Sequence, residues 1–159
     1  MSVEYYEDIK LHQKARSREY HLSDKEIIDY ASVWDPRPFH IDPEFAKKSE
    51  IGGLFASGSH LVAILHRLAV EKDLNEAYIA GMGWEKVQFL QPARPGDILT
   101  LEEEVLWKRE SKSNPNVGLV HHTARLVNQR GEAVFTLETT GMVKKRPVNS
   151  APSSQSAAH

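Results

Sequence analysis

The spacing of hydrophobic residues changes near Leu74 and divides the chain into a helical half and a strand half. From Gly58 to about Leu74, apolar side chains cover too much of a helix circumference for a surface helix, which predicts a helix wrapped by other elements. Turn signals then separate strand-like segments near 82–90, 97–109, 117–128 and 132–144. With a further strand near 15–22, the pattern predicts an α+β fold in which an antiparallel sheet curls around one long helix.

Two shorter helices are predicted before the long one. Ser23 is followed three residues later by Glu26, which is a capping-box pattern, and apolar residues at helical spacing then lead to Asp35. Asp42 and Pro43 suit a helix cap and a first helical position, so a brief helix is predicted over residues 43–48. The large aromatic residues are assigned to the core by default: Trp34, Phe39, Phe55, Trp84 and Phe89.

The loop between the two shorter helices carries candidate chemistry. Prolines at positions 36 and 38 oppose helix formation, so we expect Asp35 and His40 on a stiff, non-helical loop. A carboxylate and an imidazole held in this way can share one water and remove its proton. On residue types alone, the pair can equally be a helix-ending aspartate and a histidine that satisfies loop carbonyls. Gly58 begins the long helix, where free amides favour negative charge or where glycine merely permits close packing.

Three motifs resemble those of the MaoC-like dehydratases and (R)-specific enoyl-CoA hydratases, a family with the hot-dog fold. Asp35, Pro38 and His40 match the Asp-x-Asn-Pro-x-His signature, and Gly58 matches the glycine that begins the central helix. Arg37 departs from the signature, because the family usually has asparagine there. The third motif, a Pro-x-x-Pro-Gly-Asp turn, is matched by Pro92, Pro95, Gly96 and Asp97.

The resemblance extends over roughly residues 5–145, which is nearly the whole patterned part of the chain. It predicts a single hot-dog domain over residues 1–146. Residues 147–159 are rich in serine, alanine and proline without an apolar pattern, which predicts a disordered tail.

The resemblance implies a hydro-lyase that adds water reversibly to a trans-2-enoyl-CoA, or a similar acyl thioester, and forms an (R)-3-hydroxyacyl thioester. Asp35 and His40 would activate the water, and the Gly58 amide would receive the negative charge that develops on the thioester oxygen. The substrate itself carries coenzyme A, so no separate cofactor is expected, and a homodimer or larger homo-oligomer is implied. Further residues expected to contact the substrate are Arg37, Phe39, Phe55 and Ser57.

Other functions stay open on the residues alone. Hot-dog acyl-CoA thioesterases often have an acidic residue on the central helix, whereas no acid occurs here between Glu50 and Glu71. A non-catalytic acyl-CoA-binding protein is compatible with Arg37, since a cation beside Asp35 can pair with it and weaken it as a base. No metal site is expected, because no metal-binding spacing accompanies Asp35 and His40.

Composition narrows the partners and the compartment. A chain of 159 residues with 40% hydrophobic content suits one domain, and a net charge of -2 offers no basic excess for nucleic acid. The lack of cysteine, of a signal-peptide pattern and of any apolar stretch near the roughly 20 residues of a membrane span indicates a cytoplasmic protein with no membrane partner. The sequence does not specify the acyl chain, the pathway, or whether coenzyme A or acyl carrier protein carries the substrate.

Overall fold

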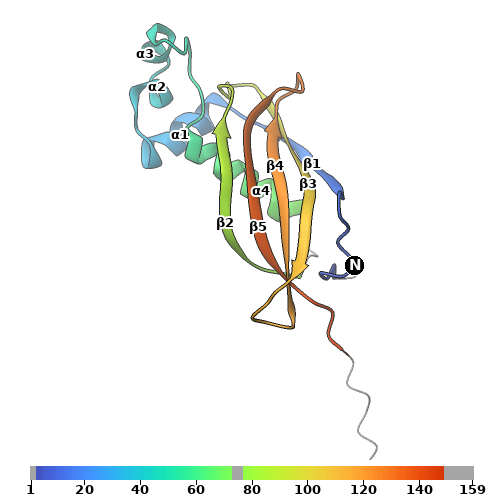
Figure 1. Ribbon diagram of the computed structural model, residues 1–159. Coiled ribbons are helices and arrows are strands. Elements are labelled where there is room, and N and C mark those ends of the chain that lie inside the picture. Colours follow the sequence, from blue (N-terminus) through green and yellow to red (C-terminus); the bar gives the residue numbers. More distant parts are fainter. Residues whose placement is uncertain (1–2, 73–76, 149–159) are drawn as a thin grey trace, which may run out of the picture.

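The computed structural model describes residues 3–72 and 77–148, and it places one long helix against one face of a curved sheet (Figure 1). The helix predicted to reach Leu74 extends to Lys72 within the described residues. Apart from its first two residues, the predicted disordered tail lies outside them. The elements in chain order are β1 (Lys14–His21), α1 (Asp24–Trp34), α2 (Pro38–Ile41), α3 (Pro43–Lys48), α4 (Gly58–Lys72), β2 (Tyr78–Phe89), β3 (Ile98–Glu110), β4 (Val117–Val127) and β5 (Ala133–Lys144).

The five strands form one antiparallel sheet in the order β1-β3-β4-β5-β2. This arrangement confirms the predicted sheet curled around a helix, with the strand predicted near 15–22 at one edge. β2 begins at Tyr78, four residues before its predicted start. Its pairing with β5 shifts register at three places, and such bulges interrupt the alternation from which strands are recognised.

The core lies between α4 and the concave face of the sheet. Leu61, Leu65 and Leu68 on α4 are buried in one cluster with residues from three strands, among them Leu101 and Phe135. Burying each such side chain contributes about 1.5–3 kcal/mol, so this contact fixes the position of the helix on the sheet. Within the described residues, none of the helices has the length and apolarity that crossing a bilayer demands.

The three short helices α1, α2 and α3 project beyond one end of the sheet (Figure 1). The predicted caps are present: Ser23 Oγ accepts from the Glu26 N–H, and Asp42 Oδ1 accepts from the amides of the first turn of α3. The prediction of a non-helical loop was wrong for Pro38–Ile41, which forms the single turn α2. Proline fits the first position of a helix, because the N–H that it lacks would be unpaired there anyway.

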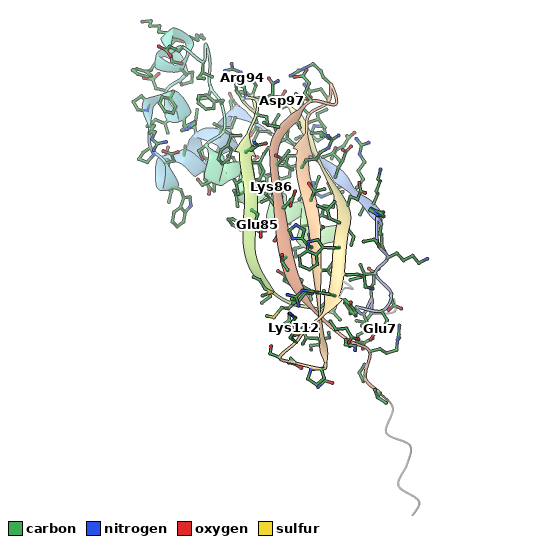
Figure 2. The ribbon with its side chains drawn as sticks, in the orientation of Figure 1. Glu7, Glu85, Lys86, Arg94, Asp97 and Lys112 are labelled. Carbon is green, nitrogen blue, oxygen red and sulfur yellow. The ribbon has the colours of Figure 1, made fainter. Side chains whose placement is uncertain are left out.

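The Pro-Gly-Asp turn joins the sheet to the segment that precedes α4. Asp97 is buried and accepts a hydrogen bond from the Arg94 N–H at 2.8 Å, which fixes the turn. Figure 2 shows Arg94 and Asp97 at the end of the sheet nearest the short helices. The Arg94 guanidinium donates to the carbonyls of Ile51 and Gly53 at 2.5 and 2.8 Å. This third motif therefore has a structural role: it holds the chain that enters α4.

Candidate active site

A cleft of about 770 Å³ lies where α4 begins. Its walls come from the end of α1, from α2, from the segment before α4 and from the end of β2 with the loop that follows. It brings together six of the seven residues expected at the site: Asp35, Arg37, Phe39, His40, Phe55 and Gly58.

Ser57 is the residue that the structure does not bring into the cleft. Its side chain is fully buried, and its Oγ accepts from the His60 N–H at 3.3 Å. A serine in this position caps the first turn of the helix. The contact with substrate expected for Ser57 therefore has no support from its placement.

Asp35 and His40 face each other at the bottom of this cleft. Asp35 ends α1, where its N–H donates to the Ala31 carbonyl at 2.9 Å. His40 is buried on α2, and its Nε2 lies 3.6 Å from Asp35 Oδ2. This separation exceeds a direct hydrogen bond, but one water can bridge two groups spaced in this way.

The tautomer of His40 follows from its other ring nitrogen. Nδ1 lies 2.7 Å from the Phe55 carbonyl oxygen, which can only accept, so Nδ1 carries the hydrogen. In the neutral ring, Nε2 then has a lone pair directed toward Asp35. Two acceptors that face one another across this gap can each take a hydrogen from the same water. The oxygen of that water keeps its lone pairs for attack on a carbon.

Two phenylalanines hold the imidazole in place. The rings of Phe39 and Phe55 are stacked with centroids 5.6 Å apart, and both meet the His40 ring edge-on, at 4.7 and 4.5 Å. Edge-to-face contacts of this kind contribute about 0.5–1.5 kcal/mol each and define the ring orientation. Phe39 and Phe55 therefore position the His40 ring, and they also give the cleft an apolar wall.

Gly58 is the first residue of α4, and its N–H has no acceptor among the described residues. An unpaired amide at a helix start carries partial positive charge. The reason for glycine here is space: a Cβ at this position would lie 2.8 Å from Cε1 and Cζ of Phe89. Real Cβ contacts are never this short, so the Phe89 ring lies directly against the backbone at Gly58.

The end of β2 supplies a wall that the sequence analysis assigned to the core. Phe89 and Trp84 are 57% and 50% exposed, and Trp34 at the end of α1 is 71% exposed. Their assignment to the core was wrong. Apolar character alone does not distinguish a core residue from one that lines a cleft or an open sheet edge. The start of α4 at Gly58 and the end of β2 at Phe89 are 31 positions apart and meet only after folding, so no local signal marks Phe89.

The other histidines among the described residues do not line the cleft. His60 is buried, stacks on Tyr30 at 4.3 Å and lies 3.3 Å from a Glu26 oxygen. Burial lowers the pKa of His60, and Glu26 opposes that shift only in part. His121 and His122 point to opposite faces of β4, as alternation predicts.

A second cavity, of about 570 Å³, lies between α4 and the sheet, with His122 in its wall. Also in its wall is Glu103, which pairs with His122 and Lys72 at 3.4 and 3.0 Å. Burial raises the pKa of Glu103, but the interactions with His122 and Lys72 outweigh burial and hold the pKa below its ordinary value. The negative charge of Glu103 in this cavity is therefore already balanced by its partners within the protein.

One cluster of possible metal ligands occurs on the other face of the sheet, where atoms of Glu85, His121 and Glu138 come within 4.8 Å of one another. Figure 2 shows Glu85, a member of this cluster, and its neighbour Lys86 on β2. Lys86 Nζ donates to Glu138 at 2.8 Å, and His121 Nδ1 lies 2.9 Å from Thr140 Oγ1. The cluster is thus an ion-pair network on the sheet, away from the candidate active site.

Residues 8–125 match the family described as "MaoC like domain". The chain belongs to this family, and its fold is the hot-dog fold. Among solved structures, the MaoC-like dehydratase from Rhodospirillum rubrum is 38% identical with a TM-score of 0.85, covering 91% of this chain and 99% of that one. The (R)-hydratase from A. caviae involved in PHA biosynthesis is 26% identical with a TM-score of 0.70, covering 87% and 98%.

A shorter match joins this chain to a characterised enzyme. Over 74 residues it is 36% identical to Mesaconyl-CoA hydratase from Cereibacter sphaeroides. The match includes 46% of this chain but only 21% of that protein. The family thus includes hydratases, and the match leaves most of that enzyme's length without a counterpart here.

Proposed function

We propose that the protein is a hydro-lyase that adds water reversibly to a trans-2-enoyl thioester of coenzyme A. The observation that carries this proposal is that the Asp35–His40 pair and Gly58, at the start of α4, line the same cleft. Membership of a family that includes hydratases supports the same reaction. The product is a 3-hydroxyacyl thioester, and the likeness to an (R)-hydratase supports the (R) configuration.

The water bound by Asp35 Oδ2 and His40 Nε2 attacks C3 of the enoyl group. One of the two groups takes a proton from the water as the O–C3 bond forms, and the π electrons move toward the thioester oxygen. General-base catalysis of this kind contributes about 10²–10⁴-fold, which is only part of a typical enzymatic acceleration. Return of a proton to C2 completes the addition.

The rest of the acceleration comes from stabilising the negative charge that develops on the thioester oxygen. The Gly58 N–H and the start of α4 offer it a hydrogen bond and a favourable dipole. Removing one donor of this type in other enzymes costs about 10²–10³-fold in rate. The Phe89 ring lies against the backbone at Gly58 and gives this part of the cleft an apolar wall.

The reaction is tested by mixing the purified protein with crotonyl-CoA and with a longer trans-2-enoyl-CoA. We expect the absorbance of the conjugated enoyl group to fall at the rate of turnover, and the product to be oxidised by an (R)-specific 3-hydroxyacyl-CoA dehydrogenase. Oxidation by the (S)-specific enzyme instead would contradict the stereochemistry. Release of free coenzyme A without loss of the conjugated bond would favour a thioesterase.

The structure gives the thioesterase alternative little support. Glu71 is the first acid on α4, and it lies more than three helical turns from Gly58. Hydrogen bonds from Arg18 and Arg67 lower the pKa of Glu71 to about 2. A carboxylate paired with two arginines is a poor nucleophile or base, so the described residues of α4 offer hydrolysis no acidic candidate.

We also propose that the protein is a homodimer joined along the β2 edge of its sheet. The opposite edge, β1, carries Lys14, Arg16 and Arg18, charges that discourage edge-to-edge pairing. β2 instead exposes a row of large apolar side chains: Tyr78, Ile79, Met82, Trp84, Val87 and Phe89. Antiparallel pairing of two β2 strands would cover them. It would also bring the active-site cleft of one protomer close to the second cavity of the other.

The double substitution Ile79→Lys/Val87→Lys is expected to convert the dimer to a monomer. Both side chains are 42% exposed on the β2 edge, and pairing about a two-fold axis would bring like charges together. Light scattering at micromolar concentration measures the mass, which should fall from twice the 18.0 kDa of one chain to that value.

Leu11→Lys is the matched control, because Leu11 is 53% exposed in a loop away from β2. This variant should stay dimeric. A wild-type protein that is already monomeric, or a lysine variant that keeps the dimer mass, contradicts the proposed edge.

A further inference from the structure

Arg37 is the one permanent cation among the described residues that line the active-site cleft. Arg37 directly precedes Pro38 and lies between Asp35, at the end of α1, and His40 on α2. Its side chain is 67% exposed toward the cleft and solvent. Apart from the Asp35 carboxylate beside Arg37, the described lining residues are mostly apolar or aromatic, so Arg37 is the group in this cleft that can attract an anion.

The hydrogen-bonding capacity of Arg37 is largely unused. Its Nε lies 3.4 Å from Asp35 Oδ1, and within residues 3–72 and 77–148 this is the only polar contact of its side chain. The four hydrogens on its Nη atoms therefore face no protein acceptor there. Arg94 provides the contrast, because its Nη atoms donate to the backbone carbonyls of Ile51, Gly53 and Leu54. Arg94 is a structural arginine, whereas Arg37 has donors available for a ligand.

The position of Arg37 indicates which part of a ligand it can reach. Asp35 contacts Arg37 through Oδ1 and His40 through Oδ2, so the guanidinium and the attacking water lie at opposite oxygens of one carboxylate. The acyl carbon that receives the water is therefore within a few bonds of Arg37. The phosphates of coenzyme A are separated from that carbon by the whole pantetheine arm. A group bound by Arg37 in the reactive complex thus belongs to the acyl chain.

We propose that Arg37 binds a carboxylate on the acyl group, next to the reacting carbon, and so selects monothioesters of unsaturated dicarboxylic acids. This inference rests on the proposed hydration. A guanidinium can bind a carboxylate through two parallel hydrogen bonds, which suits the free Nη donors. Binding there also draws Arg37 away from Asp35 and leaves that carboxylate to the water. The product of addition is a 3-hydroxyacyl thioester whose hydroxyl and carboxylate share one carbon.

The test compares two four-carbon substrates that differ only at the end of the acyl chain: fumaryl-CoA, which has a carboxylate, and crotonyl-CoA, which has a methyl group. We expect wild-type kcat/KM to favour fumaryl-CoA. Arg37→Asn should lower the ratio of kcat/KM for fumaryl-CoA to kcat/KM for crotonyl-CoA by about 10- to 100-fold. This factor corresponds to the free energy that one hydrogen-bonded charge pair contributes to binding. Arg37→Lys should give an intermediate ratio, because it keeps the charge and loses the paired donors.

Each contrary outcome has a separate meaning. An unchanged ratio in Arg37→Asn, or an equal rise in KM for both substrates, overturns the inference while hydration stands. If no protein hydrates either substrate, the proposed function fails, and calorimetric binding then decides the role of Arg37. Tighter binding of fumaryl-CoA that is lost in Arg37→Asn would still support a carboxylate site. Equal binding of the two thioesters would overturn it. Thermal melting of each variant confirms that it is folded.

Discussion

Asp35→Asn is expected to lower kcat/KM for enoyl-CoA hydration by about 10²–10⁴-fold while leaving the melting temperature nearly unchanged. The asparagine amide has almost the same shape, but its nitrogen donates where the water must also donate. The water held between Asp35 Oδ2 and His40 Nε2 then loses one of its two acceptors. The measurement is the initial rate of loss of enoyl absorbance under subsaturating substrate.

The same substitution at Asp42 is the matched control. Asp42 caps α3 through its Oδ1, and asparagine is an equally good cap, so Asp42→Asn should fold and keep its activity. His40→Ala should lose activity to a similar extent as Asp35→Asn. Because both residues act on one water, the double variant should be little worse than either single variant. Independent, multiplying losses would show that the two side chains do not share a water.

The sequence was sufficient to predict the main architecture because its strongest patterns are local. The apolar circumference from Gly58 to about Leu74 predicts a wrapped helix, and alternation with turn signals predicts four of the five strands closely. β2 was predicted less well, since its bulges and its glycines at positions 81 and 83 interrupt the strand pattern. The single turn α2 was missed because Pro38 was interpreted as a helix breaker rather than as a first helical residue.

The candidate site was predictable only in part. Asp35 and His40 stand in one short segment, so a motif resemblance can locate both. The contacts that prepare them come from distant parts of the chain: the Phe55 carbonyl fixes the His40 tautomer, and the Phe89 ring covers Gly58. Trp84 and Phe89 were misassigned for a related reason. An exposed apolar strand edge and a buried one have the same composition, and the choice between them depends on neighbours that the chain pattern does not specify.

Gly58 has two separable roles: its lack of a Cβ leaves space for the Phe89 ring, and its N–H can donate a hydrogen bond to the substrate. Two pairs of variants distinguish these roles. Gly58→Ala alone should be destabilised and weakly active, because its Cβ would lie 2.8 Å from the Phe89 ring. Removing that ring in Gly58→Ala/Phe89→Leu should recover much of the stability, measured by thermal or denaturant unfolding. Phe89→Leu alone is the reference for both properties, since Phe89 also lines the cleft.

Gly58→Pro/Phe89→Leu is expected to be about 10²–10³-fold slower in kcat than Gly58→Ala/Phe89→Leu, while having similar stability. Proline is favoured at the first position of a helix, so it removes the Gly58 N–H without interrupting α4. The Ser57 side chain still caps the first turn, through the His60 N–H. The two variants differ in the amide hydrogen and in the two further ring carbons of proline, one of which replaces that hydrogen on the nitrogen. Equal kcat values in two folded proteins would therefore show that this amide does not bind the thioester oxygen, and that Gly58 is required only for its contact with Phe89.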